Sequence, residues 1–199
     1  MNAGPSWALV RKDIMEALRR GGLHIAVANA GRGTFSTILD HPLEEWLAIL
    51  DLCLTGVFLT VQQSAKVMCD GGSIITISSL NGTQPAAGMG AYCTAKAGVI
   101  MLTQVAAMEL GDRGIRVSVL CPQSVQTGMT TPGPSAARVD GVLQAPEVAR
   151  MVLEAMEAER FLILSHPQVH DYMQRKASNA ERWLTGMRRL RDRIYGGQG

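Results

Sequence analysis

The stretch SIITISSLNGTQPAAGMGAYCTAKAGV, residues 73–99, decides the fold class of this chain. It opens with an apolar, β-branched strand that ends in hydroxyl residues, passes through a loop rich in glycine, and enters a long helix. A strand, a loop and a helix in this order are typical of open α/β sheets, whose ligand sites lie at the carboxyl ends of the strands. The stretch therefore predicts an α/β fold and the place of a site.

Three side chains in this stretch fit acid/base chemistry at a carbonyl group: Ser79, Tyr92 and Lys96. Tyr92 and Lys96 are four residues apart, so they share one helix face. An ammonium within about 4–6 Å of a phenol lowers the phenol pKa from about 10, and the Ser79 hydroxyl can hold the substrate oxygen. A Tyr-x-x-x-Lys pair alone also fits an exposed helix with a solvated lysine, but its position after a strand and loop favours a site.

Six stretches in the same order resemble the short-chain dehydrogenase/reductase family, and the resemblance runs from about residue 8 to about residue 190. They are IAVANAG (25–31), LTGVFLTVQ (54–62), GSIITISS (72–79), AYCTAKAGV (91–99), RGIRVSVLCP (113–122) and VQTGM (125–129). The resemblance implies an oxidoreductase that interconverts an alcohol and a ketone by hydride transfer with NAD or NADP. It also implies a Rossmann-like, doubly wound parallel sheet.

The resemblance assigns roles to residues of this chain. It implies that Tyr92 is the acid/base, that Lys96 is its pKa-lowering partner and a ribose ligand, and that Ser79 binds the substrate oxygen. The residues that it places in cofactor binding are Asn29, Ala30, Gly31, Tyr92, Lys96, Pro122, Val125 and Thr127. The residues themselves predict no metal site, because His41, His166 and His170 are scattered and the four cysteines show no Cys-x-x-Cys spacing.

The chain departs from the family pattern in three ways. Before residue 23 it has no strand followed by a glycine-rich turn, which in the family seats the pyrophosphate on a helix N-terminus. We therefore expect a truncated, partial sheet without the family's first strands, an exposed sheet edge and weak dinucleotide binding.

Cys53 stands where the family usually has asparagine, and a thiol is a poor hydrogen-bonding group. The alternative interpretation of Cys53 is a small buried residue that packs well. Gln123 stands where glycine is usual. These departures leave open a second hypothesis, a catalytically impaired remnant with a structural or dimerisation role.

Composition and periodicity predict one domain over residues 1–199. Of the residues, 47% are hydrophobic and 18% charged, and the net charge of +2 is too small to indicate a nucleic-acid partner. Free cysteines without a secretory signal favour a reducing, cytoplasmic setting. The run WLAILDLCLTGVFLTV (46–61) has 16 residues, fewer than a membrane span needs, so we expect a buried helix and no membrane.

The pattern predicts strands that alternate with helices. The order is helix 6–20, strand 23–28, helix 42–68, strand 73–78, helix 91–110, strand 115–121, loop 122–145, helix 146–159, strand 161–165 and terminal helix 168–192. The loop 122–145 corresponds to the segment that covers the substrate in the family. The resemblance also implies a homodimer or homotetramer through helices 42–68 and 91–110, with a small alcohol or ketone as the substrate.

Overall fold

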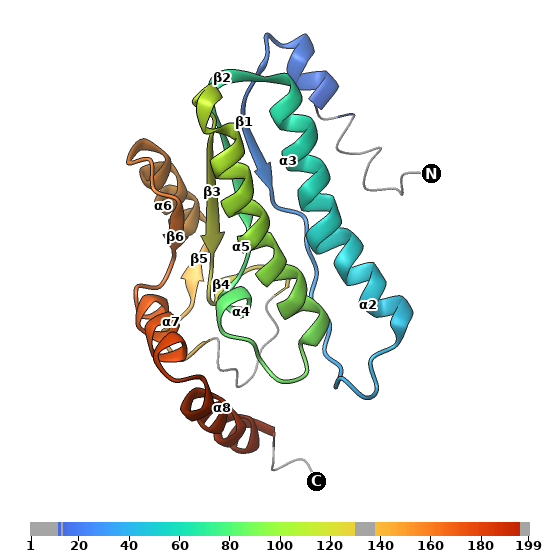
Figure 1. The fold of residues 1–199 in the computed structure, drawn as a ribbon, viewed down its shortest axis with the longest axis vertical. Coiled ribbons are helices and arrows are strands. Elements are labelled where there is room, and N and C mark those ends of the chain that lie inside the picture. Colours follow the sequence, from blue (N-terminus) through green and yellow to red (C-terminus); the bar gives the residue numbers. More distant parts are fainter. Residues whose placement is uncertain (1–11, 13, 130–137, 196–199) are drawn as a thin grey trace.

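A four-stranded parallel sheet forms the centre of the computed structural model, which describes residues 12, 14–129 and 138–195 (Figure 1). Its strands follow the order β1-β2-β3-β6, and every neighbouring pair is parallel. Their bounds are β1 (Leu23–Ala28), β2 (Met68–Ile77), β3 (Arg116–Cys121) and β6 (Leu162–Leu164). The predicted α/β class with a parallel sheet is confirmed. β1 is an end strand, and within the described residues β2 is its one neighbour.

Helices connect the strands, as parallel pairing requires. They are α2 (Leu43–Leu50), the π-helical turn η1 (Asp51–Thr55), α3 (Gly56–Val67), α4 (Leu80–Thr83), α5 (Gly90–Leu110), the short turn η2 (Gly111–Arg113), α6 (Ala145–Glu157), α7 (Gln168–Ser178) and α8 (Ala180–Tyr195). A helical segment over residues 14–19 precedes β1. Two short strands, β4 (Val125–Gln126) and β5 (Leu143–Gln144), pair in parallel outside the main sheet.

The apolar core lies on both faces of the sheet, as is usual for parallel sheets. On one face, Ile74 and Val119 pack with residues of α3 and α5, such as Val57 and Val99. On the other face, Leu120 packs with Val148 of α6 and its neighbours. Figure 1 shows α3 and α5 side by side in front of the strands, so the amino-terminal half of α5 is carried to the carboxyl edge of the sheet.

The predicted helix 42–68 is one continuous helical segment, Leu43–Val67, with η1 in its middle. It has 25 residues, and an 18-residue window within it has a mean hydropathy of 1.4, so it is long and apolar enough to cross a membrane by length and composition alone. The 16-residue run on which the expectation of no membrane rested is therefore part of a longer apolar helix, and that expectation stays a prediction. In this fold, Val57, Val61 and Ala65 of this segment are buried in the core against the sheet, whereas Leu43, Leu47 and Phe58 are exposed.

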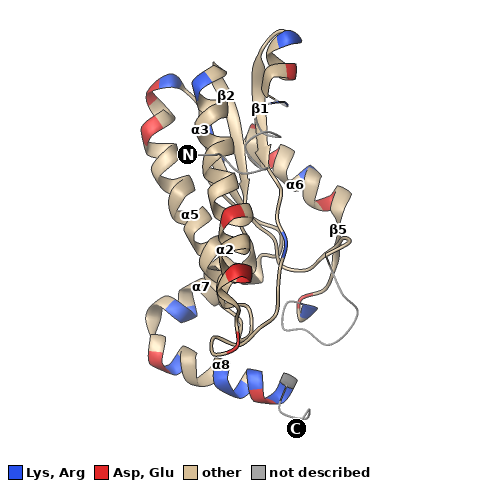
Figure 2. Ribbon diagram, turned by 90° about the vertical axis from the view of Figure 1, so that its right-hand side faces the viewer, with Lys and Arg blue, Asp and Glu red and all other residues tan. Residues whose placement is uncertain are grey.

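Two predicted elements differ from those observed. β2 begins at Met68 rather than at residue 73, since Leu23 pairs with Met68 before a shift in register. The terminal helix 168–192 is two helices, because Asn179 is extended and its side-chain oxygen accepts the Arg182 N–H at 2.8 Å. Asn179 thus caps a new helix, α8. Basic residues colour much of this helix blue in Figure 2, and its exposed arginines are Arg182, Arg188, Arg189, Arg191 and Arg193.

Smaller differences remain at the other predictions. The predicted loop 122–145 contains β4 and β5, and its residues 130–137 lie outside the described residues. Of the predicted helix 6–20, residues 6–11 and 13 also lie outside them, and the described part is helical over 12 and 14–19. The loop after Ser79 contains the one-turn helix α4.

Candidate active site

Ser79 stands where β2 leaves the sheet. The main chain there still pairs with the neighbouring strand, since the Ser78 N–H donates to the Leu120 carbonyl at 2.8 Å and the Leu80 N–H donates to the Pro122 carbonyl at 2.7 Å. Ser79 is the N-cap of α4, and its Oγ accepts the Asn81 N–H at 3.1 Å. These bonds fix the direction in which the Ser79 hydroxyl points.

Tyr92 and Lys96 lie one turn apart near the amino-terminal end of α5, and both are buried, with 7% and 3% of their surface exposed. The Lys96 Nζ is 5.6 Å from the centre of the Tyr92 ring. It also donates to the Ile77 carbonyl at 2.7 Å, which ties the lysine to the end of β2. The structure therefore brings the three residues predicted for the catalytic site to one edge of the sheet.

Glycine at position 82 lets α4 approach α5 closely. A Cβ at Gly82 would lie 2.5 Å from the Ser78 Oγ and 2.8 Å from the Lys96 carbonyl oxygen, closer than any side chain tolerates. The Ser78 Oγ donates to that same Lys96 carbonyl at 2.7 Å. The loop that carries Ser79 is thus held against the helix turn that carries Tyr92 and Lys96.

Burial governs the acidity of the site. Burial raises the pKa of the Tyr92 phenol above its usual 10.0, and a hydrogen bond with Ser79 only partly offsets this effect. Burial lowers the pKa of the Lys96 ammonium, against the opposing influence of the nearby Cys53 and Cys121 thiols. The net effect is a Tyr92 pKa above its usual 10.0 and not below it, because desolvation of the phenolate dominates. The role of Lys96 as the partner that stabilises the phenolate stays a prediction.

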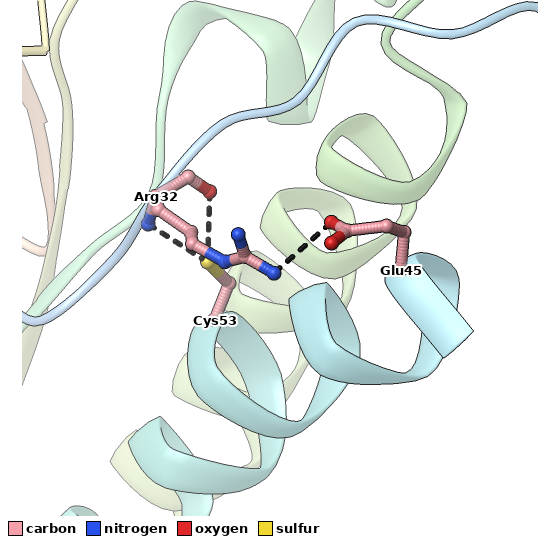
Figure 3. A network of polar contacts seen from close by, with 3 residues as sticks. All are labelled: Arg32, Glu45 and Cys53. Carbon is pink, nitrogen blue, oxygen red and sulfur yellow. Dashed lines mark hydrogen bonds and ion pairs between the residues drawn. The ribbon is translucent and has the colours of Figure 1, made fainter. Parts of the chain in front are cut away.

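Asn29, Ala30 and Gly31 follow β1 and lie exposed at the same edge of the sheet. A Cβ on Gly31 would be 3.5 Å from the Lys96 Nζ and 3.6 Å from the Cys53 Sγ, so this turn runs directly past the lysine. Cys53 is fully buried in η1, and its sulfur makes two contacts with Arg32, the residue that follows Gly31 (Figure 3). The Sγ accepts the Arg32 N–H at 3.4 Å and donates to the Arg32 carbonyl at 3.3 Å.

The remaining predicted cofactor residues follow β3. Pro122 meets the Ser79 loop through its carbonyl, as described above. The Val125 side chain packs with the core beneath α6. The predicted contact of Val125 with the cofactor would therefore be made by its backbone. Thr127 is exposed, and its Oγ1 accepts the Met129 N–H at 3.3 Å.

Gln123 stands where the family has glycine, and both its main-chain N–H and its side-chain amide make hydrogen bonds. Its N–H donates to the Ser165 Oγ at 3.3 Å, and its side-chain Nε2 donates to the Asp140 Oδ2 at 2.9 Å. Asp140 and its second partner, Tyr172, were not found by sequence reasoning. No sequence signal marks them, because the partners are 17 and 32 residues apart along the chain.

Within the described residues, no group of three or more His, Cys, Asp or Glu side chains is placed to hold a metal ion. The described cysteines are all free.

Known proteins resemble this chain in sequence. The family model for short chain dehydrogenases matches residues 6–137. A 3-alpha-(or 20-beta)-hydroxysteroid dehydrogenase of Mycobacterium tuberculosis is 46% identical over 112 residues, which are 55% of this chain and 43% of that protein. A 3-oxoacyl-[acyl-carrier-protein] reductase of Synechocystis is 40% identical over 110 residues, 54% of this chain and 44% of that protein. The chain thus spans less than half the length of these curated relatives.

Solved structures show the same fold. A short chain dehydrogenase from Burkholderia cenocepacia in complex with NADP has a TM-score of 0.74 and 28% identity, covering 82% of this chain and 73% of the other. A short chain dehydrogenase/reductase from Burkholderia phymatum in complex with NAD has a TM-score of 0.78 and 24% identity, covering 88% and 73%. Because the family model matches well over half of the residues, this chain belongs to the short-chain dehydrogenase/reductase family.

Proposed function

We propose that this protein is an NAD(P)-dependent oxidoreductase that interconverts a small alcohol and a ketone. The observation that carries the proposal is the convergence of Ser79, Tyr92 and Lys96 at the carboxyl edge of the sheet, with Lys96 bonded to the end of β2. The names of the hydroxysteroid dehydrogenase and the 3-oxoacyl reductase support a ketone or secondary alcohol as the substrate class.

The chain's own residues divide the proton chemistry among them. When bound, the nicotinamide supplies or accepts the hydride at the carbonyl carbon. Because its pKa is raised, the Tyr92 phenol is protonated at neutral pH and donates its proton to the carbonyl oxygen as that oxygen gains charge. Ser79 holds the same oxygen by a hydrogen bond. The ammonium of Lys96 then stabilises the phenolate that remains, and alcohol oxidation follows the reverse path.

The exposed turn Asn29–Gly31 fits a nucleotide cofactor. It lies at the carboxyl end of a parallel strand, where dinucleotides bind in open α/β sheets. Gly31 presents no side chain towards the Lys96 Nζ, so a ribose hydroxyl has room to approach that ammonium. We assign Asn29, Ala30, Gly31, Lys96, Pro122, Val125 and Thr127 to this contact, with NAD and NADP both open.

We further propose a homodimer or homotetramer built on α2, α3 and α5. These helices expose large apolar side chains that the sheet does not cover: Leu43, Leu47, Phe58, Met101, Val105 and Met108. Apolar patches of this kind are typical of protein interfaces. The free cysteines support a reducing, cytoplasmic setting.

The first prediction tests the proposed function through Tyr92. Purified protein is assayed with NADH and NADPH against a ketosteroid and a 3-oxoacyl thioester, and we expect turnover of at least one of them. Tyr92→Phe, which keeps the ring and removes only the proton donor, should lower kcat by about a hundredfold or more. Thr94→Ala, an exposed position on the same helix turn, serves as the control. Turnover by the Phe variant within about tenfold of the wild type would contradict the role of Tyr92.

A further inference from the structure

Helix α7 reaches the active-site edge of the sheet through Tyr172, which contacts the segment after β3. The Tyr172 hydroxyl donates to the Asp140 carboxylate, with oxygen distances of 3.0 and 2.9 Å. Asp140 also accepts the side chain of Gln123, which directly follows Pro122. Partial burial and the Asp140 carboxylate raise the pKa of Tyr172, so the hydroxyl stays protonated and continues to donate. Tyr172 therefore fixes the chain beside Pro122.

One turn further along α7, Lys176 contacts the loop after β2. Its Nζ donates to the Thr83 carbonyl at 2.6 Å and lies 5.2 Å from the centre of the Trp183 ring in α8. Trp183 in turn donates its Nε1–H to the Gln84 Oε1 at 3.0 Å. Thr83 is the last residue of α4, the short helix that Ser79 caps. Lys176 and Trp183 therefore fix the loop that begins at Ser79.

Residues four apart lie on one face of a helix, so Tyr172 and Lys176 hold two different loops with the same face of α7. Both loops flank the place where the proposed substrate meets Ser79 and Tyr92. The Lys176 donor is charged, and the acceptor of the Tyr172 hydroxyl is the Asp140 carboxylate. Both hydrogen bonds are therefore charge-assisted, and such bonds are stronger than those between neutral groups. A change of about 1 Å in the position of a substrate costs up to a hundredfold in rate.

We propose that α7 is a strut that fixes the two loops on either side of the substrate, with Tyr172 acting through Asp140 and Lys176 acting through Thr83 as positioning residues. This inference rests on the proposed function for its kinetic part alone. In this proposal the carboxyl-terminal helices set the distance between the Ser79 loop and the segment after Pro122. That spacing sets which ketone the site accepts.

The test compares Tyr172→Phe and Lys176→Met, which keep the bulk of each side chain, with Gln174→Ala, whose side chain bonds only the exposed His170 on the same helix. Hydrogen–deuterium exchange of the full protein measures the loops directly. We expect exchange about tenfold faster over residues 80–89 in the Lys176 variant and over residues 138–144 in the Tyr172 variant. Lys176→Arg should restore most of the protection, and the control should match the wild type.

Kinetics then test positioning. In both variants we expect KM for the ketone to rise about fivefold or more while the unfolding midpoint stays close to that of the wild type. The cofactor Kd should also stay unchanged in the Lys176 variant, because the loop after Ser79 is not among the residues assigned to the cofactor. Unchanged exchange in both loops, or faster exchange with an unchanged ketone KM, overturns the inference. If the wild type turns over no ketone, the proposed function fails, and the exchange measurements alone then support or overturn the strut.

Discussion

Cys53 uses one sulfur atom to hold both main-chain groups of Arg32, the residue that ends the cofactor-side turn. Thiols are weak donors and acceptors, but the Cys53 side of this part-buried pair is fully buried, and leaving a buried group without its partner is costly. The family resemblance implies that an asparagine at this position would hold a water in a proton relay beyond Lys96. Whether Cys53 weakens that relay stays a prediction, for which Cys53→Asn should raise kcat or leave it unchanged. The Arg32 side chain adds a second tie, a salt bridge of 3.0 Å to Glu45 in α2 (Figure 3).

The second prediction concerns this turn. Cys53→Ala removes both bonds to Arg32 and should raise the Kd for the nicotinamide cofactor about three- to tenfold, because the turn Asn29–Gly31 loses its anchor. Cofactor fluorescence titration measures the change. Cys69→Ala, at a half-buried cysteine in β2, is the matched control. An unchanged cofactor Kd in the Cys53 variant would show that the two bonds do not position the turn.

The third prediction is a pH dependence of stability that arises at Cys121. Burial raises the pKa of its thiol from 9.0 to about 11, against the opposing effects of Ser78, the Ser79 backbone and Lys96. The unfolded chain ionises this thiol near pH 9 and the folded chain only near pH 11. The contribution to stability is therefore complete below pH 9 and is lost as the pH rises towards 11, up to about 3 kcal/mol.

Urea unfolding at pH 8 and at pH 10.5 measures this loss. Cys121→Val keeps an apolar, strand-forming side chain at a fully buried position and should reduce the alkaline loss of stability by about 1–2 kcal/mol. Part of the loss should remain, because burial also raises the pKa of Tyr92 and Cys93. An equal alkaline loss in the variant and the wild type would contradict the assignment to Cys121.

At the scale of elements, the sequence predicted strands where apolar and β-branched residues are concentrated. β1 and β3 were placed within about one residue for that reason. The first half of β2 was missed, because MCDGG has no such pattern and Gly71 has a φ of +77°. The sequence predicts one terminal helix across Asn179, because apolar residues keep helical spacing on both sides of the break.

Some residues of the site could be predicted from local sequence pattern, whereas others could not. Tyr92 and Lys96 could be predicted because helical spacing alone brings them together, and Ser79 because it ends a strand. The contacts of Asp140 with Tyr172 and of Lys176 with Thr83 depend on how distant segments dock, 32 and 93 residues apart in the chain. Tertiary packing decides such contacts, and one sequence carries no periodic signal for them.

The fourth prediction concerns the link between β2 and α5. Thr76 and Thr103 are fully buried and share a hydrogen bond of 2.7 Å between their hydroxyls. Replacing either by valine leaves the other hydroxyl with a poorer set of partners, and each change should lower the free energy of unfolding by about 1–2 kcal/mol. The double valine variant should lose less than the sum, since the second change removes the orphaned group. Urea unfolding of the four proteins checks this, and strictly additive losses would contradict a shared bond.

At the scale of the whole molecule, the two edges of the sheet are unlike. β6 is short, with three residues, and its apolar side chains are at least partly buried. β1 has six residues and pairs only with β2 within the described residues. Alternate side chains of β1 point to opposite faces: Ala26 and Ala28 enter the core, while Ile25 and Val27 are 52% and 51% exposed. A strand with a free edge and an exposed apolar face is a template for pairing with another chain.

The fifth prediction follows from that edge. The 199-residue chain should self-associate through β1 in addition to any interface on α5, so its mass by light scattering should rise with concentration beyond a fixed oligomer. Ile25→Lys combined with Val27→Lys places charges along the strand, which natural sheets use to prevent edge pairing, and should remove the concentration-dependent part. Leu39→Lys, at an equally apolar and 95% exposed loop position, should not. If both variants reduce association alike, general surface hydrophobicity rather than the β1 edge drives it; if neither does, β1 is not the contact.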